Sequence, residues 1–530
     1  MEPVKRADIA RAVPIAALVA LTAVIALLPG HPAEAYQRAP LNALARPGDL
    51  DRTFGVNGKV VTDFGGLEAV EDLAVQSDGK IVAVGTTFNP DTQDAQVLVA
   101  RYRRDGSLDR SFGLGGKVTT RFGGTASDGN AVVLQGDGKI VVAGATGGGP
   151  TGADIALARY NADGSLDTSF GTGGTVVTDF YGTHEAALAI AVQPDGRLVV
   201  AGFTRRFGPW DTNPPDFALA RYTSEGRLDT SFDGDGKVVT AFTPGWSDLA
   251  YDVALDPSGK IVTAGWAAPD GVSGPGVVDI ARYDADGSLD TTFHGDGKVV
   301  SAPTGDNGGF GVVVQPDGKV VIAGFAFGAG AQLALLRYTG GGDLDSTFGS
   351  GGLATAPLGL GANDLVRQRD GKLVAAGTEA PPSGEPNRSK FAVARFEKTG
   401  TPDRAFHGGA VSTDLGDWDE ARSLALQADG KIVVGGFSGE LREGGPILSQ
   451  DFALARYVGT VLPCKVPNVR GRTLGVARSL IRRAQCRVGK VKRSASTRVA
   501  RGLVISQRPA AGATLPNGSR IDLLVSRGRR

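Results

Sequence analysis

The chain has 530 residues, too many for one simple core, and its 79 glycines follow no collagen period. Glycine spread between short apolar runs indicates many tight turns, short strands and an all-β body. The formal net charge of +0 hides an acidic body and a basic tail, because residues 461–530 contain 17 Lys and Arg against one acid, Asp522. No aromatic-rich basic face accompanies this tail, which argues against a nucleic-acid partner.

The N-terminus has the pattern of a secretory signal peptide, predicted over residues 1–35. Basic residues precede an apolar run from Ile15 to Leu28, and Ala33-Glu34-Ala35 provides an A-x-A cleavage site. The run is short for a membrane span, although an uncleaved anchor is the alternative. We expect a secreted chain that begins near Tyr36, an N-terminal segment over 36–47 and no membrane span in the mature protein.

Residues 48–458 are built from a repeat. A Leu-Asp pair followed by Phe recurs at steps of 55 to 62 residues, from Leu50-Asp51…Phe54 onward, and the last copy is the altered Pro402-Asp403…Phe406. A second phrase has Asp-Gly between two apolar runs, as in Asp78-Gly79. This dipeptide is a strong hairpin signal, and a two-residue turn would need positive φ at both positions. A third phrase ends in Arg-aromatic, and a fourth reads Lys-Val-Val-Thr.

Four short strands per repeat, apolar enough to be buried on both faces, predict a seven-bladed β-propeller of four-stranded blades. The first repeat supplies only a fourth strand, residues 59–62, and the last lacks one and ends at Tyr457. Closure therefore requires 59–62 to pair beside 451–457, which removes the exposed edges. An open solenoid is the alternative. The repeats, over about 48–457, resemble the delta-60 repeat family through the phrase D-G-S-L-D-x-x-F-G, and this resemblance implies fold and not chemistry.

Each repeat carries one Arg before the aromatic residue and one Asp after the Leu. Because buried charges need partners, we predict Arg-Asp pairs such as Arg101 with Asp109, and Asp51 with Arg456 across the closure. The run Asp284–Asp290 resembles the start of a calcium loop, but the Glu expected at the twelfth position is absent. Asx-turn chemistry is the alternative, and no cofactor is expected.

Asp-Gly turns and Leu-Asp turns should share one end of the sheets, and the variable loops should share the other. The four tryptophans are predicted to fall in those variable loops, so they are candidate ligand-binding residues: Trp210, Trp246, Trp266 and Trp418. The alternative is that each Trp packs its own loop. No metal triad or nucleophile-base pair emerges from the three histidines of the mature chain, so the sequence argues against an enzyme without excluding one.

After a linker at 459–462, residues 463–526 break the repeat and precede a basic tail, 527–530. Thr473 is a predicted helix N-cap before Leu474–Gln485, and three short strands complete a small α+β domain. Cys464 and Cys486 are the two cysteines of the chain, and in an oxidising compartment they should form a disulfide, with two free thiols as the alternative. The phrase V-P-N-V…V-I-S-Q-x-P-x-A-G resembles the PASTA domain, which implies recognition of cell-wall peptidoglycan or a spacer role.

These patterns predict a secreted or envelope-associated binding or scaffold protein, expected to be a monomer. Its propeller face would take an unknown ligand or a protein partner. Its C-terminal module would take a cell-wall glycan or an anionic wall polymer. The alternative function is a propeller-fold hydrolase or lactonase with a metal at the channel mouth.

Overall fold

The structure, a computed structural model, describes residues 45–529 except 150–151, 182–183, 206–213, 270–274, 328–330, 357, 359–360, 382–387, 442–446, 460–462, 485 and 516–517. The chain divides into two compact units, one of Leu50–Ala428 with Ile432–Tyr457 and one around Val458–Arg530. The predicted signal peptide and Trp210 lie outside the described residues. None of the helices described is both long and apolar enough to cross a membrane.

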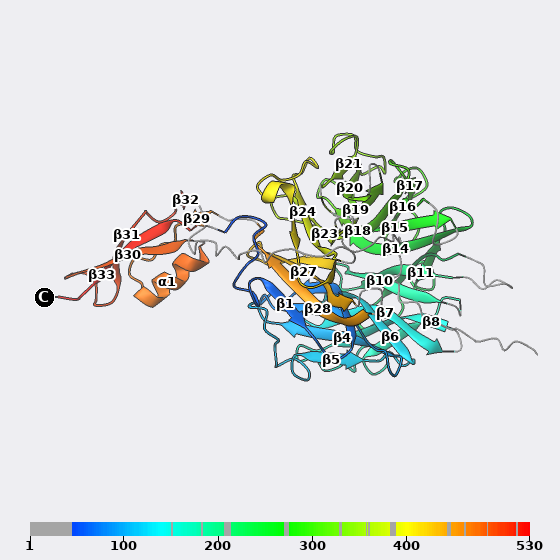
Figure 1. Ribbon diagram of the computed structural model, residues 1–530, viewed down its shortest axis with the longest axis horizontal. Helices are drawn as coiled ribbons and strands as arrows, with labels where there is room; N and C mark the ends of the chain where they lie inside the picture. The colour runs from blue at the N-terminus through cyan, green and yellow to red at the C-terminus, as the bar shows by residue number, and fades with distance from the viewer. Residues whose placement is uncertain are drawn as a thin grey trace, which may run out of the picture. The chain divides into compact units, whose positions relative to one another are not determined.

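The first unit is all-β, and its strands are antiparallel within each repeat (Figure 1). Four repeats form separate four-stranded sheets in chain order. Their strands are β10 (Glu185–Val192), β11 (Leu198–Thr204), β12 (Asp216–Tyr222) and β13 (Lys237–Thr240); β14 (Trp246–Leu255), β15 (Ile261–Pro269), β16 (Val277–Tyr283) and β17 (Lys298–Ser301); β18 (Asn307–Val314), β19 (Val320–Phe327), β20 (Ala331–Tyr338) and β21 (Leu353–Thr355); β22 (Gly361–Arg367), β23 (Leu373–Glu379), β24 (Lys390–Phe396) and β25 (Ala410–Thr413).

The other strands of this unit join into one twelve-stranded sheet, because single residue pairs link neighbouring repeats at Leu67–Gln450 and Ala95–Ala126. A short 3₁₀ helix, η1, spans His407–Gly409. The twelve strands are β1 (Lys59–Thr62), β2 (Leu67–Val75), β3 (Ile81–Asn89), β4 (Asp94–Tyr102), β5 (Lys117–Thr120), β6 (Ala126–Leu134), β7 (Ile140–Gly149), β8 (Gly152–Tyr160), β9 (Thr175–Thr178), β26 (Trp418–Leu426), β27 (Ile432–Leu441) and β28 (Ile447–Tyr457).

The first strand of the chain pairs with the last strand of the unit. β1 runs antiparallel to β28, with Lys59 opposite Ala455 and Thr62 opposite Phe452. The pairing expected between 59–62 and 451–457 is therefore present. The first strands of successive repeats also contact one another in chain order, from β2 through β6, β10, β14, β18 and β22 to β26, and β26 contacts β2.

The Asp-Gly turns differ in detail from the expected two-residue hairpin. Gly79 has φ 84°, whereas Asp78 is not among the residues with positive φ. The Gly79 N–H donates to the Gln76 carbonyl, and the Gln76 N–H donates to the Lys80 carbonyl. This is a three-residue loop in which Gly occupies the left-handed position of a bulge, so only one of the two residues needs positive φ.

A β-bulge recurs in the first strand of every repeat. In β2 the register shifts between Val70 and Asp72, and Glu71 is the extra residue. The bulge pushes a backbone carbonyl toward the glycine of the second strand, since a Cβ on Gly85 would lie 1.8 Å from the Ala69 oxygen. The same clash, at 1.7 to 1.9 Å, holds for the six equivalent glycines, which are Gly144, Gly202, Gly265, Gly324, Gly377 and Gly436.

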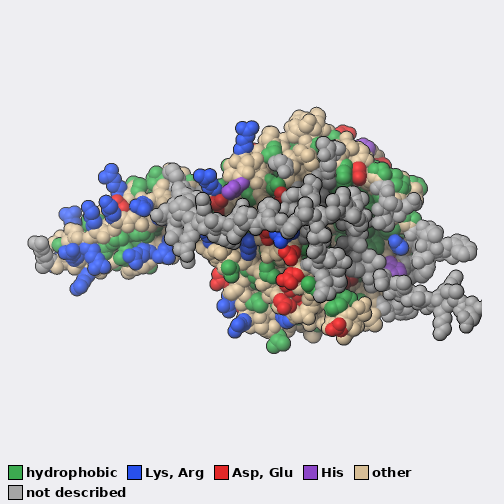
Figure 2. Space-filling view, viewed as in Figure 1, with side chains coloured by type: hydrophobic (Ala, Val, Ile, Leu, Met, Phe, Trp, Pro, Cys, Tyr) green, Lys and Arg blue, Asp and Glu red, His purple; other side chains and the backbone are tan. Residues whose placement is uncertain are grey.

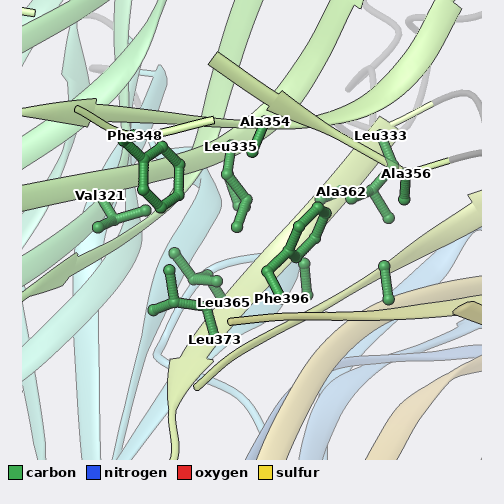
Figure 3. Close-up of a cluster of buried hydrophobic side chains, with 13 residues drawn as sticks. Val321, Leu333, Leu335, Phe348, Ala354, Ala356, Ala362, Leu365, Leu373 and Phe396 are labelled. Carbon is green, nitrogen blue, oxygen red and sulfur yellow. The ribbon is translucent and has the colours of Figure 1, made fainter. Parts of the chain in front are cut away.

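The hydrophobic core lies between neighbouring sheets. Figure 3 shows one cluster, in which Val321 and Leu335 of one repeat meet Leu365 and Leu373 of the next around Phe348. Because both faces of a sheet are buried in this way, its strands read as apolar runs in the sequence.

The second unit contains one helix, α1 (Leu474–Arg483), with the predicted N-cap, because the Thr473 side chain accepts from the Val476 N–H. Ala477 and Ile481 on this helix are fully buried. The unit has five strands where three were expected, and one that the sequence did not indicate is β30, Arg487–Ser494, which pairs in parallel with β33. Its strands are β29 (Cys464–Lys465), β30 (Arg487–Ser494), β31 (Val504–Arg508), β32 (Thr514–Leu515) and β33 (Arg520–Ser526).

Candidate functional site

The repeated Arg and Asp form buried pairs at the end of the sheets that carries the Asp-Gly and Leu-Asp turns, which we call the Asp-Gly end. Arg101 Nε donates to Asp109 Oδ2 at 2.9 Å, and Arg456 Nε donates to Asp51 Oδ2 at 2.9 Å. Both predicted pairs are therefore present. The same bond joins the five other pairs, which are Arg159–Asp167, Arg221–Asp229, Arg282–Asp290, Arg337–Asp345 and Arg395–Asp403.

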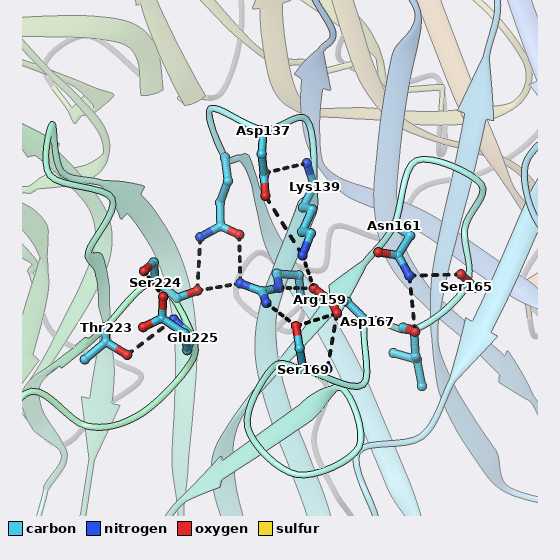
Figure 4. Close-up of polar contacts among 12 residues, drawn as sticks. Asp137, Lys139, Arg159, Asn161, Ser165, Asp167, Ser169, Thr223, Ser224 and Glu225 are labelled. Carbon is cyan, nitrogen blue, oxygen red and sulfur yellow. Dashed lines mark hydrogen bonds and ion pairs between the residues drawn. The ribbon is translucent and has the colours of Figure 1, made fainter.

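These arginines also connect one repeat to the next. The Arg337 guanidinium lies 4.4 Å from the Phe348 ring centroid, and its Nη1 donates to the Lys398 carbonyl of the following repeat at 2.8 Å. Figure 4 shows the equivalent network, in which Arg159 meets Asp167 and Ser169 and donates to the Ser224 carbonyl. Each nitrogen of Arg159 and of Arg337 makes a hydrogen bond within the fold, which favours a structural role for these side chains.

The basic residue that follows the glycine of the turn joins this network in six repeats, as Arg197 in one and as lysine in the others, a role that the sequence did not predict. Lys139 Nζ donates to Asp167 at 2.5 Å, and this bond comes first among the causes that hold the pKa of Asp167 well below its usual range. In the run Asp284–Asp290, which resembles the start of a calcium loop, Asp290 pairs with Arg282 at 2.5 Å and with Lys260 at 2.8 Å. Asp286 accepts a hydrogen bond from the Ser288 N–H of its own turn. The Asx-turn alternative therefore describes these side chains.

At the opposite end, which we call the variable-loop end, a polar residue of the first strand holds the loop before it. Glu68 accepts from the Phe64 and Gly66 N–H groups, and Asp419 accepts from the Leu415 N–H at 2.6 Å. Burial is the first cause that raises the pKa of both carboxyls. Glu68 and Asp419 are thus residues of the strands β2 and β26 rather than of the loops that they hold.

Three half-buried carboxylates on the first strands join neighbouring repeats. Asp72, Asp252 and Asp364 accept the backbone N–H of the residue sixty positions later, at 2.8, 2.7 and 2.7 Å. Burial and then the charge of Asp364 raise the pKa of Asp72 to about 7. Ser423 of the last repeat donates to Asp72 at 2.8 Å, and Arg422 pairs with Glu71 of the first repeat.

One repeat departs from the others by placing two carboxyls in its interior. Asp279 on β16 stands where five repeats have alanine, and it interacts with Asp248 on β14. Both side chains are 0% exposed. Among the described residues, neither oxygen of Asp279 has another hydrogen-bond partner. Burial and the neighbouring carboxyl raise the pKa of Asp279 to about 9, and burial is the first cause that raises that of Asp248 to about 7.

Two groups of three carboxylates at the variable-loop end could hold a cation. The ligand oxygens of Asp63, Glu68 and Asp451 lie within 4.8 Å of one another, and so do those of Asp154, Asp179 and Glu185. In the repeat between them Arg121 takes the place of Asp63, and it pairs with Asp94 at 2.5 Å. The sequence analysis missed both groups, because each draws on two repeats.

The candidate tryptophans have different environments. Trp266 lies inside strand β15 rather than in a loop and is only 5% exposed, so its ring belongs to the core. Trp246 and Trp418 are the half-buried first residues of β14 and β26, and Trp418 packs edge-on against Phe437 at 4.7 Å. Among the described residues no ring contact joins the tryptophans to one another.

The second unit is crosslinked and basic. Cys464 and Cys486 form a disulfide, as expected, and both lie in the core of the unit. Figure 2 shows Lys and Arg side chains spread over the face that this unit presents in that view. A groove of about 650 Å³ on its surface is lined by Arg470, Arg498 and Arg529 together with Ser496 and Thr497.

Comparisons with known families agree with this two-part organisation. Residues 465–527 match the PASTA domain. Five segments match the DUF5122 beta-propeller domain of unknown function, namely 76–112, 135–170, 193–232, 257–293 and 315–348. The chain therefore contains a DUF5122 beta-propeller repeat region and a C-terminal PASTA domain, which confirms both resemblances.

Curated relatives match over a short part of the chain. The probable serine/threonine-protein kinase PknB of Lactococcus lactis is 40% identical over 75 residues, 14% of this chain and 12% of the kinase. A probable serine/threonine-protein kinase of Clostridium acetobutylicum is 41% identical over 63 residues, 12% of this chain and 10% of the kinase. The chain thus spans about a tenth of the length of these relatives.

Solved structures resemble the chain more distantly. The beta-propeller domain of the Trilobed protease from Pyrococcus furiosus covers 75% of this chain and 95% of its own, with 13% identity and a TM-score of 0.38. The Pseudomonas aeruginosa periplasmic gluconolactonase PpgL covers 74% and 99%, with 15% identity and a TM-score of 0.39. A Dyadobacter fermentans protein of unknown function covers 76% and 98%, with 11% identity and a TM-score of 0.40.

Proposed function

We propose that this is an exported, cell-envelope binding and scaffold protein whose PASTA domain attaches it to the wall and whose propeller presents a ligand-binding surface. One observation carries the proposal: the PASTA match falls in a unit with 17 basic residues and one acid. Such a surface attracts the anionic polymers of a cell wall. The signal-like N-terminus and the disulfide fit an oxidising compartment outside the cytoplasm.

The propeller is proposed to consist of seven four-stranded blades in a closed ring. The pairing of β1 with β28 and the contact of β26 with β2 support closure. The Arg422–Glu71 ion pair at the same junction supports it further. Closure would give the variable loops one common face, on which residues of different repeats could meet a single ligand.

Binding to purified cell-wall fractions tests the attachment. We expect residues 36–530 to sediment with walls and residues 36–462 to stay in the supernatant, provided that both show a cooperative thermal melt. Equal sedimentation of the two would assign wall binding to the propeller. If neither sediments, the proposal is wrong.

Ligand binding by the propeller is proposed to involve Trp246 and Trp418, because their half-buried rings combine apolar area with a donor. Screening wall glycans and secreted proteins against Trp246→Ala and Trp418→Ala tests this role. Trp266→Phe is the matched control, since Trp266 is buried in the core. A ligand that binds all three variants equally would show that the Trp246 and Trp418 rings take no part in binding it.

A metal-dependent hydrolase or lactonase remains the second candidate, and one observation favours it: three carboxylates converge at Asp63, Glu68 and Asp451. Lactone and glycoside hydrolysis assayed with calcium, zinc or a chelator tests it. Metal-dependent turnover that Asp451→Asn abolishes would support a metal-dependent enzyme. Turnover that neither the chelator nor Asp451→Asn changes would assign the activity to another site.

A further inference from the structure

The groove of the second unit has a consistent chemistry. Three arginines line it, and Arg470, Arg498 and Arg529 are all exposed. Ser496 and Thr497 add hydroxyl groups, and Ile505 adds an apolar patch, whereas no acidic residue lines it. The groove therefore offers guanidinium donors and hydroxyls to a ligand, and among its described lining residues no carboxylate is available to pair with a cationic group.

The walls of the groove are held in place by hydrogen bonds. The loop between β30 and β31 is tied to the C-terminal segment, because the Ser496 N–H donates to the Gly528 carbonyl at 3.1 Å and Ser526 Oγ donates to the Val499 carbonyl at 2.6 Å. On the other wall, Arg470 Nε donates to the Ile505 carbonyl at 3.4 Å. A pre-formed site loses less conformational entropy when it binds.

The positive charge of the groove is not neutralised within the unit. Across the described part of 463–529, no salt bridge includes any side chain. The single acidic side chain, Asp522, accepts the Lys490 N–H at 2.6 Å. The propeller unit differs, because most of its buried arginines sit within 3 Å of a carboxylate.

We propose that this groove binds the phosphodiester groups of an anionic polymer such as a poly(glycerol phosphate). The inference rests on the proposed wall attachment and names the ligand class and the residues. A guanidinium matches a phosphate with two parallel hydrogen bonds, and three arginines along one groove can engage successive charges of a polymer. Peptide-bearing wall fragments bring amino groups as well as carboxylates, and the groove has no acid to receive them.

Titration of the full chain with purified poly(glycerol phosphate) tests the proposal, with poly-glutamate as the carboxylate comparison. The triple variant Arg470→Ala, Arg498→Ala and Arg529→Ala should lose at least about tenfold in affinity, because its charge-assisted hydrogen bonds are removed. The matched control, Arg478→Ala with Arg482→Ala and Arg487→Ala, removes the same charge from exposed positions outside the groove.

Each outcome decides the matter. A loss confined to the groove variant, with poly-glutamate bound more weakly by the wild type, supports the proposal. Equal losses in the two triple variants would overturn it in favour of diffuse charge attraction, and equal binding of both polymers would overturn the phosphodiester assignment. Wild-type chain that sediments with walls but ignores poly(glycerol phosphate) would overturn the groove while the wall attachment stands.

Discussion

At the Asp-Gly end of the sheets, Asp167 and its counterparts meet Arg and Lys, and their pKa values are lowered. At the variable-loop end and along the first strands, Glu68, Asp72 and Asp248 lie among apolar groups and backbone amides, and their pKa values are raised. Carboxyl pKa values are thus shifted in opposite directions in these two regions of the sheets. The first end is repeated almost without change, which is typical of a structural role, and the second varies from repeat to repeat, as a binding surface can.

The largest effect should come from breaking a buried pair at the Asp-Gly end. Arg101→Ala leaves Asp109 buried beside Lys80 and should cost about 3–5 kcal/mol of unfolding free energy. Arg103 also approaches Asp109, at 3.6 Å, but its side chain is 54% exposed. Arg103→Ala should therefore cost less than about 1 kcal/mol. Urea unfolding compares the two, and equal losses would contradict a structural role that depends on burial.

A second test addresses the β-bulge in the first strand of each repeat. Gly324→Ala places a Cβ 1.7 Å from the Gly308 carbonyl and should destabilise the chain by roughly 3 kcal/mol, the upper range for overpacking. Gly136→Ala is the matched control, because nothing lies within 4 Å of its Cβ. Thermal unfolding measures both. If Gly324→Ala melts like the control, the bulge geometry is wrong.

The same type of substitution, Asp to Asn, should change the unfolding free energy in opposite directions at two buried positions. Asp167→Asn removes the charge that faces Arg159 and Lys139 and should destabilise by about 2 kcal/mol at pH 7.5. Asp279, with a pKa of about 9, must take up a proton to be buried at pH 7.5. Asp279→Asn replaces it with a neutral amide that can donate to Asp248, so stability should rise by about 1 kcal/mol. A loss of stability in both variants would contradict the opposite electrostatic environments assigned to Asp167 and Asp279.

The pH profile tests the same contrast through the carboxyls that folding keeps protonated. Folding raises the pKa of Asp72, Asp248 and Asp279, so the folded state holds more protons and stability falls as pH rises from about 4 through the folded values of about 7 to 9. The lowered group, Asp167, acts oppositely and loses its contribution only as pH falls below about 4. Urea unfolding at pH 8.5 should therefore give an unfolding free energy at least about 2 kcal/mol lower than at pH 5.5, which is the contribution of one carboxyl whose pKa is raised to about 7.

Asp279→Ala offers an internal control for that profile, because alanine is the residue of five other repeats. It should flatten the decline between pH 5.5 and 8.5 and leave the acid side unchanged. A wild-type stability that is constant over this range would contradict the raised pKa values of the buried carboxyls.

The sequence by itself determined the repeat, the strands and the residues that pair at the Asp-Gly end. These features follow from local patterns: Asp78-Gly79 specifies a turn, apolar runs specify buried strands, and a charge repeated at Arg101 and Asp109 requires a partner at a constant offset of eight residues. The disulfide of the second unit followed from there being only two cysteines.

Only the tertiary structure decided which residues of different strands and repeats meet. The Asp248–Asp279 pair joins two non-adjacent strands of one sheet. The Asp63–Glu68–Asp451 group and the sixty-residue links of Asp72 and Asp364 depend on the stacking of neighbouring sheets. Strand β30 was missed because its bulge between Val488 and Val491 breaks the period of two. The Arg470 groove likewise joins three segments more than twenty residues apart, and no local pattern brings such segments together.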